Sequence, residues 1–123
     1  FRYLQQDIIP AAPHSVLFVL GRYAPDAQSS PDDLRPFLEH TDKLQVPRMV
    51  CAFGAGEQAC LLDAAVHNGH VRIGFENNLL RPNGQTANDN RQQLEDLRIA
   101  VKHKTLIFAS SKQARKILSI RTA

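Results

Sequence analysis

The chain has 123 residues, of which 43% are hydrophobic and 22% charged, a composition typical of a globular segment rather than a disordered or fibrous one. No apolar run approaches the roughly 18 residues that a membrane-spanning helix needs, which excludes that class of protein. Two cysteines are too few for a disulfide-rich secreted scaffold, and no charged-then-apolar leader opens the chain. We therefore expect a reducing, cytoplasmic setting.

A strand followed by a helix is the first unit that the sequence predicts. The run HSVLFVL over 14–20 is apolar and is bounded by a proline and a glycine, as in a strand buried on both faces. Ser30, Pro31 and Asp33 then supply an N-cap, a first-turn proline and a first-turn acid for a helix.

The same unit recurs along the chain. Apolar strands are predicted over 48–53 and 70–75, and each precedes a segment with apolar residues at helical spacing, over 57–66 and 90–101. A short apolar stretch over 106–109 precedes Ser110 and Gln113, which form a capping box for a closing helix.

Alternating strands and helices predict an α/β fold with a parallel sheet covered by helices. Three to four βα units amount to about half of a TIM (β/α)₈ barrel, which takes about 250 residues. We therefore expect residues 1–123 to form a single partial domain, the C-terminal part of such a barrel. Further chain or a partner should cover the open sheet edges, and we expect a homo-oligomer.

Basic residues dominate the last quarter of the chain, where no acidic residue follows Asp96. Such a segment can meet nucleic acid or a phosphorylated ligand, but cations also occur on solvated helix faces and near helix C-termini. We favour the second interpretation and do not expect nucleic acid as a partner. The basic residues are Arg98, Lys102, Lys104, Lys112, Arg115, Lys116 and Arg121.

Polar side chains are concentrated at the end of the third predicted strand, where Arg72, Glu76, Asn77 and Asn78 occur. The carboxyl ends of parallel strands are where α/β proteins build their active sites. Strand alternation places Arg72, Gly74 and Glu76 on one face. The arrangement predicts either a ligand site or a structural ion pair.

The stretch over 69–79, GHVRIGFENNL, carries the most specific pattern in the chain. Weaker matches surround it, at 18–21, 53–54, Gly84, Ala87, Asn90 and 114–118. Together these residues resemble the beta-keto acid cleavage enzymes, the family of the 3-keto-5-aminohexanoate cleavage enzyme.

This resemblance implies a TIM barrel whose divalent metal, usually zinc, is held by two histidines of an early strand and one glutamate of the last strand. Glu76 matches that glutamate, and Arg72 matches the arginine of the same strand. The implied reaction joins a beta-keto acid with acetyl-CoA and gives acetoacetate and the CoA ester of the shortened acid. No redox cofactor is implied.

Two departures from the family pattern affect this interpretation. The family usually has an aspartate after the metal-binding glutamate, implied to act in proton transfer, whereas this chain has Asn77, whose amide cannot accept a proton at neutral pH. The five histidines include no His-x-His pair, so Glu76 would be one ligand of a site completed elsewhere. A catalytically silent, metal-binding relative, acting as a structural or regulatory subunit, is therefore an alternative.

The turn containing Gly54 and Gly56 lies between a predicted strand and a predicted helix, where anions can bind. In a barrel it would face the pantetheine or phosphates of CoA. It also permits a third hypothesis, a nucleotide-binding α/β module, although the G-x-G-x-x-G pattern is incomplete. Cys51, Cys60 and His70 are interpreted as structural.

Overall fold

A parallel three-stranded sheet organises the computed structural model, which describes residues 2–9, 14–41, 46–104 and 106–120. The strand order is β1-β2-β3, and each strand pairs in parallel with its neighbour. This is a mixed α/β fold, as predicted. The elements are α1 (Arg2–Gln5), β1 (Val16–Leu20), the 3₁₀ helix η1 (Pro31–Leu34), α2 (Arg35–Thr41), β2 (Arg48–Ala52), α3 (Glu57–Val66), β3 (His70–Val71), α4 (Asn90–His103) and α5 (Ser111–Ile117).

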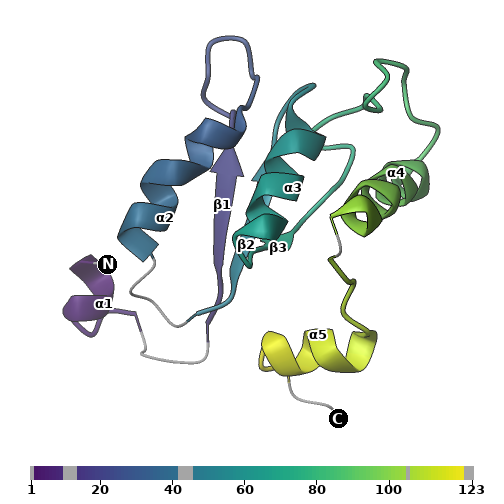
Figure 1. The fold of residues 1–123 in the computed structure, drawn as a ribbon. Coiled ribbons are helices and arrows are strands. Elements are labelled where there is room, and N and C mark those ends of the chain that lie inside the picture. Colours follow the sequence, from purple (N-terminus) through teal and green to yellow (C-terminus); the bar gives the residue numbers. More distant parts are fainter. Residues whose placement is uncertain (1, 10–13, 42–45, 105, 121–123) are drawn as a thin grey trace.

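The described part of the chain forms an open sheet and does not show a portion of a barrel. Figure 1 shows α2 and α3 over one face of the sheet and α5 set apart from it. Three strands are present in the described ranges, and the apolar stretch over 106–109 adds no fourth.

The third strand is shorter than predicted, because it ends at Val71 instead of position 75. The Arg72 amide still donates to the Val50 carbonyl (2.9 Å). The chain then leaves the sheet in a turn, since the amide of Phe75 donates to the Asn90 side chain (2.9 Å) rather than to a strand. The hydrophobic periodicity of the sequence cannot predict this hydrogen bond, because Asn90 lies 15 positions further along the chain.

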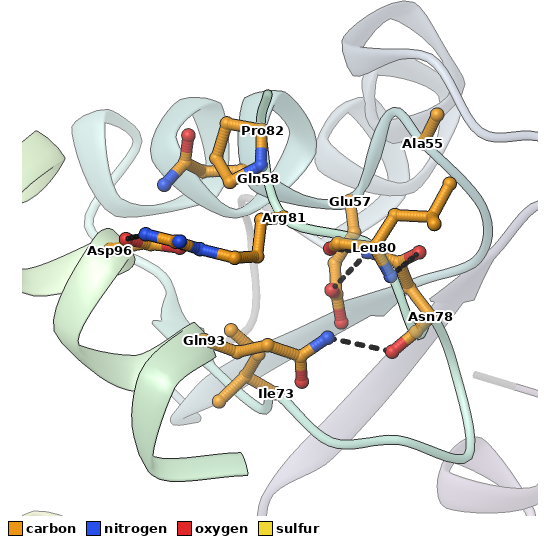
Figure 2. Close-up of a pocket in the computed structure, with 10 residues that line it drawn as sticks. All are labelled: Ala55, Glu57, Gln58, Ile73, Asn78, Leu80, Arg81, Pro82, Gln93 and Asp96. Carbon is orange, nitrogen blue, oxygen red and sulfur yellow. Dashed lines mark hydrogen bonds and ion pairs between the residues drawn. The ribbon is translucent and has the colours of Figure 1, made fainter. Parts of the chain in front are cut away.

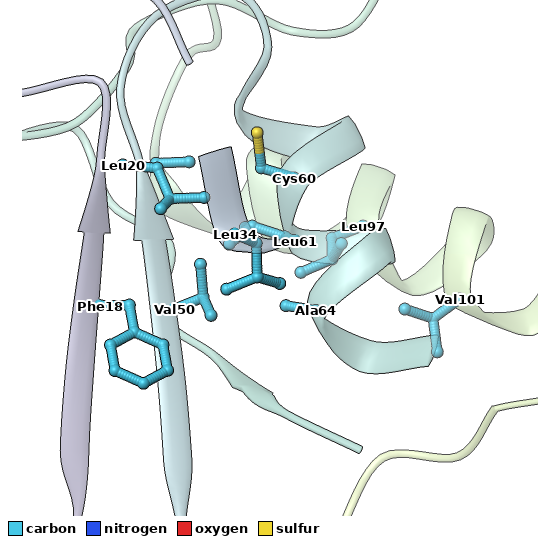
Figure 3. Packing of buried hydrophobic residues seen from close by; sticks show 10 residues of the cluster. Phe18, Leu20, Leu34, Val50, Cys60, Leu61, Ala64, Leu97 and Val101 are labelled. Carbon is cyan, nitrogen blue, oxygen red and sulfur yellow. The ribbon is translucent and has the colours of Figure 1, made fainter. Parts of the chain in front are cut away.

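The apolar core of the described residues lies between the sheet and the helices (Figure 3). Alternate residues of β1 and β2 point towards α3, and Phe18 also stacks on Phe37 with ring centroids 4.9 Å apart. Burial of this surface is the main source of stability for such a layer. The buried cluster comprises Phe18, Leu20, Leu34, Val50, Ala52, Cys60, Leu61, Ala64, Leu97 and Val101.

Helix termini follow the predicted capping rules. Ser30 and Asp33 form a capping box at η1, and Ser110 and Gln113 form another at α5. Basic residues occupy the last turns of α4 and α5, where the helix dipole favours cations. Arg121 of the basic segment lies outside the described residues.

Across the described ranges, every helix is too short or too polar to cross a lipid bilayer.

Candidate functional site

The candidate site lies at the carboxyl edge of the sheet, where the segments that follow all three strands meet. The Phe53 amide donates to the Leu20 carbonyl (3.0 Å), and the Gly54 amide donates to the Asn77 carbonyl (3.2 Å). In-register parallel pairing brings these strand ends to one edge. The residues predicted from sequence therefore belong to a common neighbourhood, although their side chains point in different directions.

Arg72 and Glu76 form an ion pair beyond the end of β3. Their side chains are 41% and 54% exposed, so a ligand can reach both charges. Arg72 also donates to the Cys51 sulfur (3.7 Å), and this contact fixes its position beside β2. The pair confirms the predicted proximity of the two charges, and solvent screening makes it a weak stabilising contact.

Asn77 is buried, with 7% of its surface exposed, whereas the adjacent Glu76 is exposed. The Asn77 amide donates to the Gly74 carbonyl (2.9 Å), which closes the turn. Its side-chain oxygen Oδ1 has no hydrogen-bond partner among the described residues. The turn therefore directs these consecutive side chains into different environments, solvent and interior.

The glycines of the turn between β2 and α3 have a packing role. Gly54 has a φ of +76°, and a Cβ there would meet the side chain of Gln28. A Cβ at Gly56 would collide with the backbone oxygen of Ser29. Gln28 also accepts a hydrogen bond from the Ala55 amide (2.9 Å). Close packing of two loops thus accounts for both glycines, and their predicted contact with a cofactor stays a prediction.

We expect Gly56→Ala to lower the free energy of unfolding by about 1–3 kcal/mol, because the added methyl group overpacks the contact with Ser29. Denaturant unfolding would measure the change, with Ala59→Ser on the exposed side of α3 as the control. Unchanged stability combined with weaker CoA binding would instead favour a cofactor role for the turn.

A complete metal centre is not formed within the described ranges, where no three histidine, cysteine, aspartate or glutamate side chains lie close enough together to hold an ion. A catalytic zinc needs three protein ligands. Glu76 can supply one carboxylate, and His70 lies at the other end of β3. These residues do not by themselves fit the zinc that the resemblance implies.

Glu57 is the site residue that sequence reasoning missed. It begins α3, is 2% exposed and accepts a hydrogen bond from the side chain of Asn78 (3.1 Å). Burial raises its pKa from 4.5 to about 7, against the opposing effect of hydrogen bonds from Asn78 and the Gly74 backbone. An acid in the first turn of a helix is usually interpreted as a partner of the helix dipole. The sequence feature that could have identified Glu57 is its position directly after a glycine turn at the end of a strand.

A small cavity of about 20 Å³ adjoins Glu57 (Figure 2). Arg81 and Asp96 line it and bind each other through two contacts of 2.8 and 2.9 Å. This hydrogen bonding lowers the pKa of the Asp96 carboxyl and raises that of Arg81. Gln93 also lines the cavity and is buried.

A larger open groove of about 850 Å³ runs between β3, α4 and α5 and is lined mainly by apolar side chains. Its lining follows the chain from Gly69 through β3 to Ile73. Neither Arg72 nor Glu76 lines the groove, so it is not part of the candidate site.

Comparison with known protein families provides an independent test of the resemblance. The model of the beta-keto acid cleavage enzyme family matches residues 1–120. The match extends well beyond the stretch over 69–79 and includes all three strands and the helices between them. The chain therefore belongs to the beta-keto acid cleavage enzyme family.

Proposed function

We propose that this protein cleaves a beta-keto acid with acetyl-CoA as co-substrate, giving acetoacetate and a shortened acyl-CoA. The observation that carries the proposal is the solvent-accessible Arg72–Glu76 pair at the carboxyl edge of a parallel sheet, within a chain of this family. Such an edge is where α/β enzymes place their chemistry. We further propose that the described units are the C-terminal part of a TIM barrel.

Arg72 is proposed to bind the carboxylate or the developing oxyanion of the substrate. A guanidinium offers two parallel N–H donors to a carboxylate and remains charged at all relevant pH values. Its partial exposure allows exchange of Glu76 for a substrate carboxylate. The Cys51 sulfur of β2 accepts from the same guanidinium (3.7 Å) and contributes to its placement.

A direct test is an assay of the full protein with a panel of beta-keto acids and acetyl-CoA, in which mass spectrometry follows both products. Arg72→Ala is expected to lower kcat/KM by about 100-fold, because a charge-assisted hydrogen bond to the reacting substrate is worth up to about 3 kcal/mol. Arg91→Ala on the exposed face of α4 is the matched control. Equal activity of the Arg72 and Arg91 variants would remove Arg72 from the site.

Glu76 is proposed as one ligand of zinc or another divalent metal. This proposal rests on the family and on the exposed carboxylate. Glu76→Gln should lower the metal content of the purified full protein, because the ligand loses its charge. Elemental analysis would measure the content, with Glu95→Gln as the control. Unchanged content would exclude Glu76 as a ligand.

Acetyl-CoA is proposed to bind near the turn of Gly54 and Gly56, which lies at the same edge as Arg72. We also propose a cytoplasmic homo-oligomer. Free, buried Cys51 and Cys60 suit a reducing compartment, and the open strand edges suit assembly.

A catalytically silent relative is the second candidate function, and Asn77 is the observation that favours it. An amide occupies the position where the resemblance implies a proton-transferring aspartate. This candidate predicts that the protein binds a beta-keto acid or acetyl-CoA in calorimetry but forms no product.

A further inference from the structure

Helix α4 holds the turn over 74–78 from one side through two residues one helical turn apart. Asn90 accepts a hydrogen bond from the Phe75 amide (2.9 Å). Gln93 donates from Nε2 to the Asn78 carbonyl (2.7 Å). Residues three apart lie on the same helix face, so α4 presents both to the turn. The turn that carries Glu76 and Asn77 is therefore attached to a helix rather than to a neighbouring strand.

Helix α3 holds the same turn from the other side through the single carboxylate of Glu57. Its Oε2 atom accepts a hydrogen bond from the Asn78 side chain (3.1 Å), at the end of the turn. Figure 2 shows Glu57 and Gln93 extending from two different helices towards Asn78.

The burial of Glu57 is not explained by neutralisation of its charge. Arg81 lies in the same cavity but is engaged with Asp96 through two hydrogen bonds. The other carboxylate oxygen of Glu57, Oε1, has no hydrogen-bond partner in the described part of the chain. A buried carboxylate without a cation is costly, so an apolar residue at this position would be the more stable choice.

We propose that Glu57 is a positioning residue, whose carboxylate holds the Asn78 side chain and so orients the turn that carries Glu76 and Asn77. It is not a catalytic residue, because a side chain that is 2% exposed cannot touch the substrate. As far as it concerns the reaction, this inference rests on the proposed function.

Two substitutions in the full protein test the inference through kcat and KM. Glu57→Ala removes the hydrogen bond with Asn78 and is expected to lower kcat by about 100-fold, the scale of a misplacement of about 1 Å at a reacting centre. Glu57→Gln keeps an acceptor oxygen for Asn78 and is expected to retain kcat within about threefold. Glu95→Ala, an exposed carboxylate on α4, is the control and should change neither constant.

Amide hydrogen exchange at Asn77, whose backbone amide closes the turn on the Gly74 carbonyl, supplies a readout that does not depend on turnover. Exchange should be at least about tenfold faster in Glu57→Ala than in the natural protein, and nearly unchanged in Glu57→Gln. If the natural protein turns over no beta-keto acid, the proposed function fails, while this measurement still decides whether Glu57 orients the turn. Should Glu57→Ala fail to fold, Asn78→Ala removes the side-chain bond from the other partner and should lower kcat in the same direction.

Three results would overturn the proposal. The first is a Glu57→Ala protein whose kcat stays within threefold of the natural value. The second is a Glu57→Gln protein that is as impaired as Glu57→Ala, because the charge and not the hydrogen bonding would then matter. The third is an unchanged exchange rate at the Asn77 amide in Glu57→Ala.

Discussion

Asn77→Asp is expected to raise the turnover of a beta-keto acid with acetyl-CoA by about 100-fold to 10,000-fold, the usual contribution of a general acid–base group. The family resemblance implies a carboxylate at this position, and the amide of Asn77 cannot accept a proton. Glu76 cannot replace it, since its carboxylate is the proposed metal ligand and is exposed, whereas Asn77 is buried.

Burial also determines how the introduced carboxylate should behave. Asn77 is 7% exposed, and desolvation favours the neutral form of an acid, so the pKa of an aspartate here should lie above its ordinary range. The pH profile of kcat should therefore show a basic group nearer to neutrality than a free carboxylate. Asn88→Asp on the exposed loop before α4 is the matched control and should leave turnover unchanged.

Two outcomes would contradict the assignment of position 77. If the natural protein turns over at ordinary enzyme rates and Asn77→Asp is no faster, another residue is the base. If neither form turns over while substrate still binds, the protein is a silent relative.

Glu57→Gln is expected to change the free energy of unfolding by different amounts at high and low pH. Above pH 7 the variant should gain about 3 kcal/mol more stability, relative to the natural protein, than it does below pH 4.5. The folded carboxyl has a pKa of about 7, against 4.5 for the ordinary group. Between these values the folded state holds a proton that the unfolded chain has already lost, so the stability of the natural protein falls as the pH rises. A shift of this size corresponds to about 3 kcal/mol, and glutamine does not titrate.

Denaturant unfolding of the full protein at pH 4.5 and pH 8 would measure this difference. Glu95→Gln, which removes an exposed carboxylate on α4, should show no comparable pH dependence. The stability difference between Glu57→Gln and the natural protein could instead be the same at both pH values. That result would show that folding does not raise the pKa of Glu57. The positioning role would be unaffected by that result, since it depends on hydrogen bonds.

The sequence by itself determined the local elements and the family. Apolar runs ended by glycines predicted β1 and β2, and capping residues such as Ser30 and Ser110 predicted the helix starts, because these signals act within a few residues of the chain. The motif over 69–79 also located Arg72 and Glu76 at the carboxyl edge, since strand direction alone specifies which end they occupy.

Only the tertiary structure decided what happens after Val71. The prediction continued the strand to position 75, whereas Asn90, Gln93 and Glu57 from two helices hold the chain in a turn. These contacts join residues 15 or more positions apart, and no periodicity encodes them. Burial of Asn77 and the raised pKa of Glu57 follow from the same packing, because desolvation depends on which elements cover a side chain rather than on its neighbours in sequence.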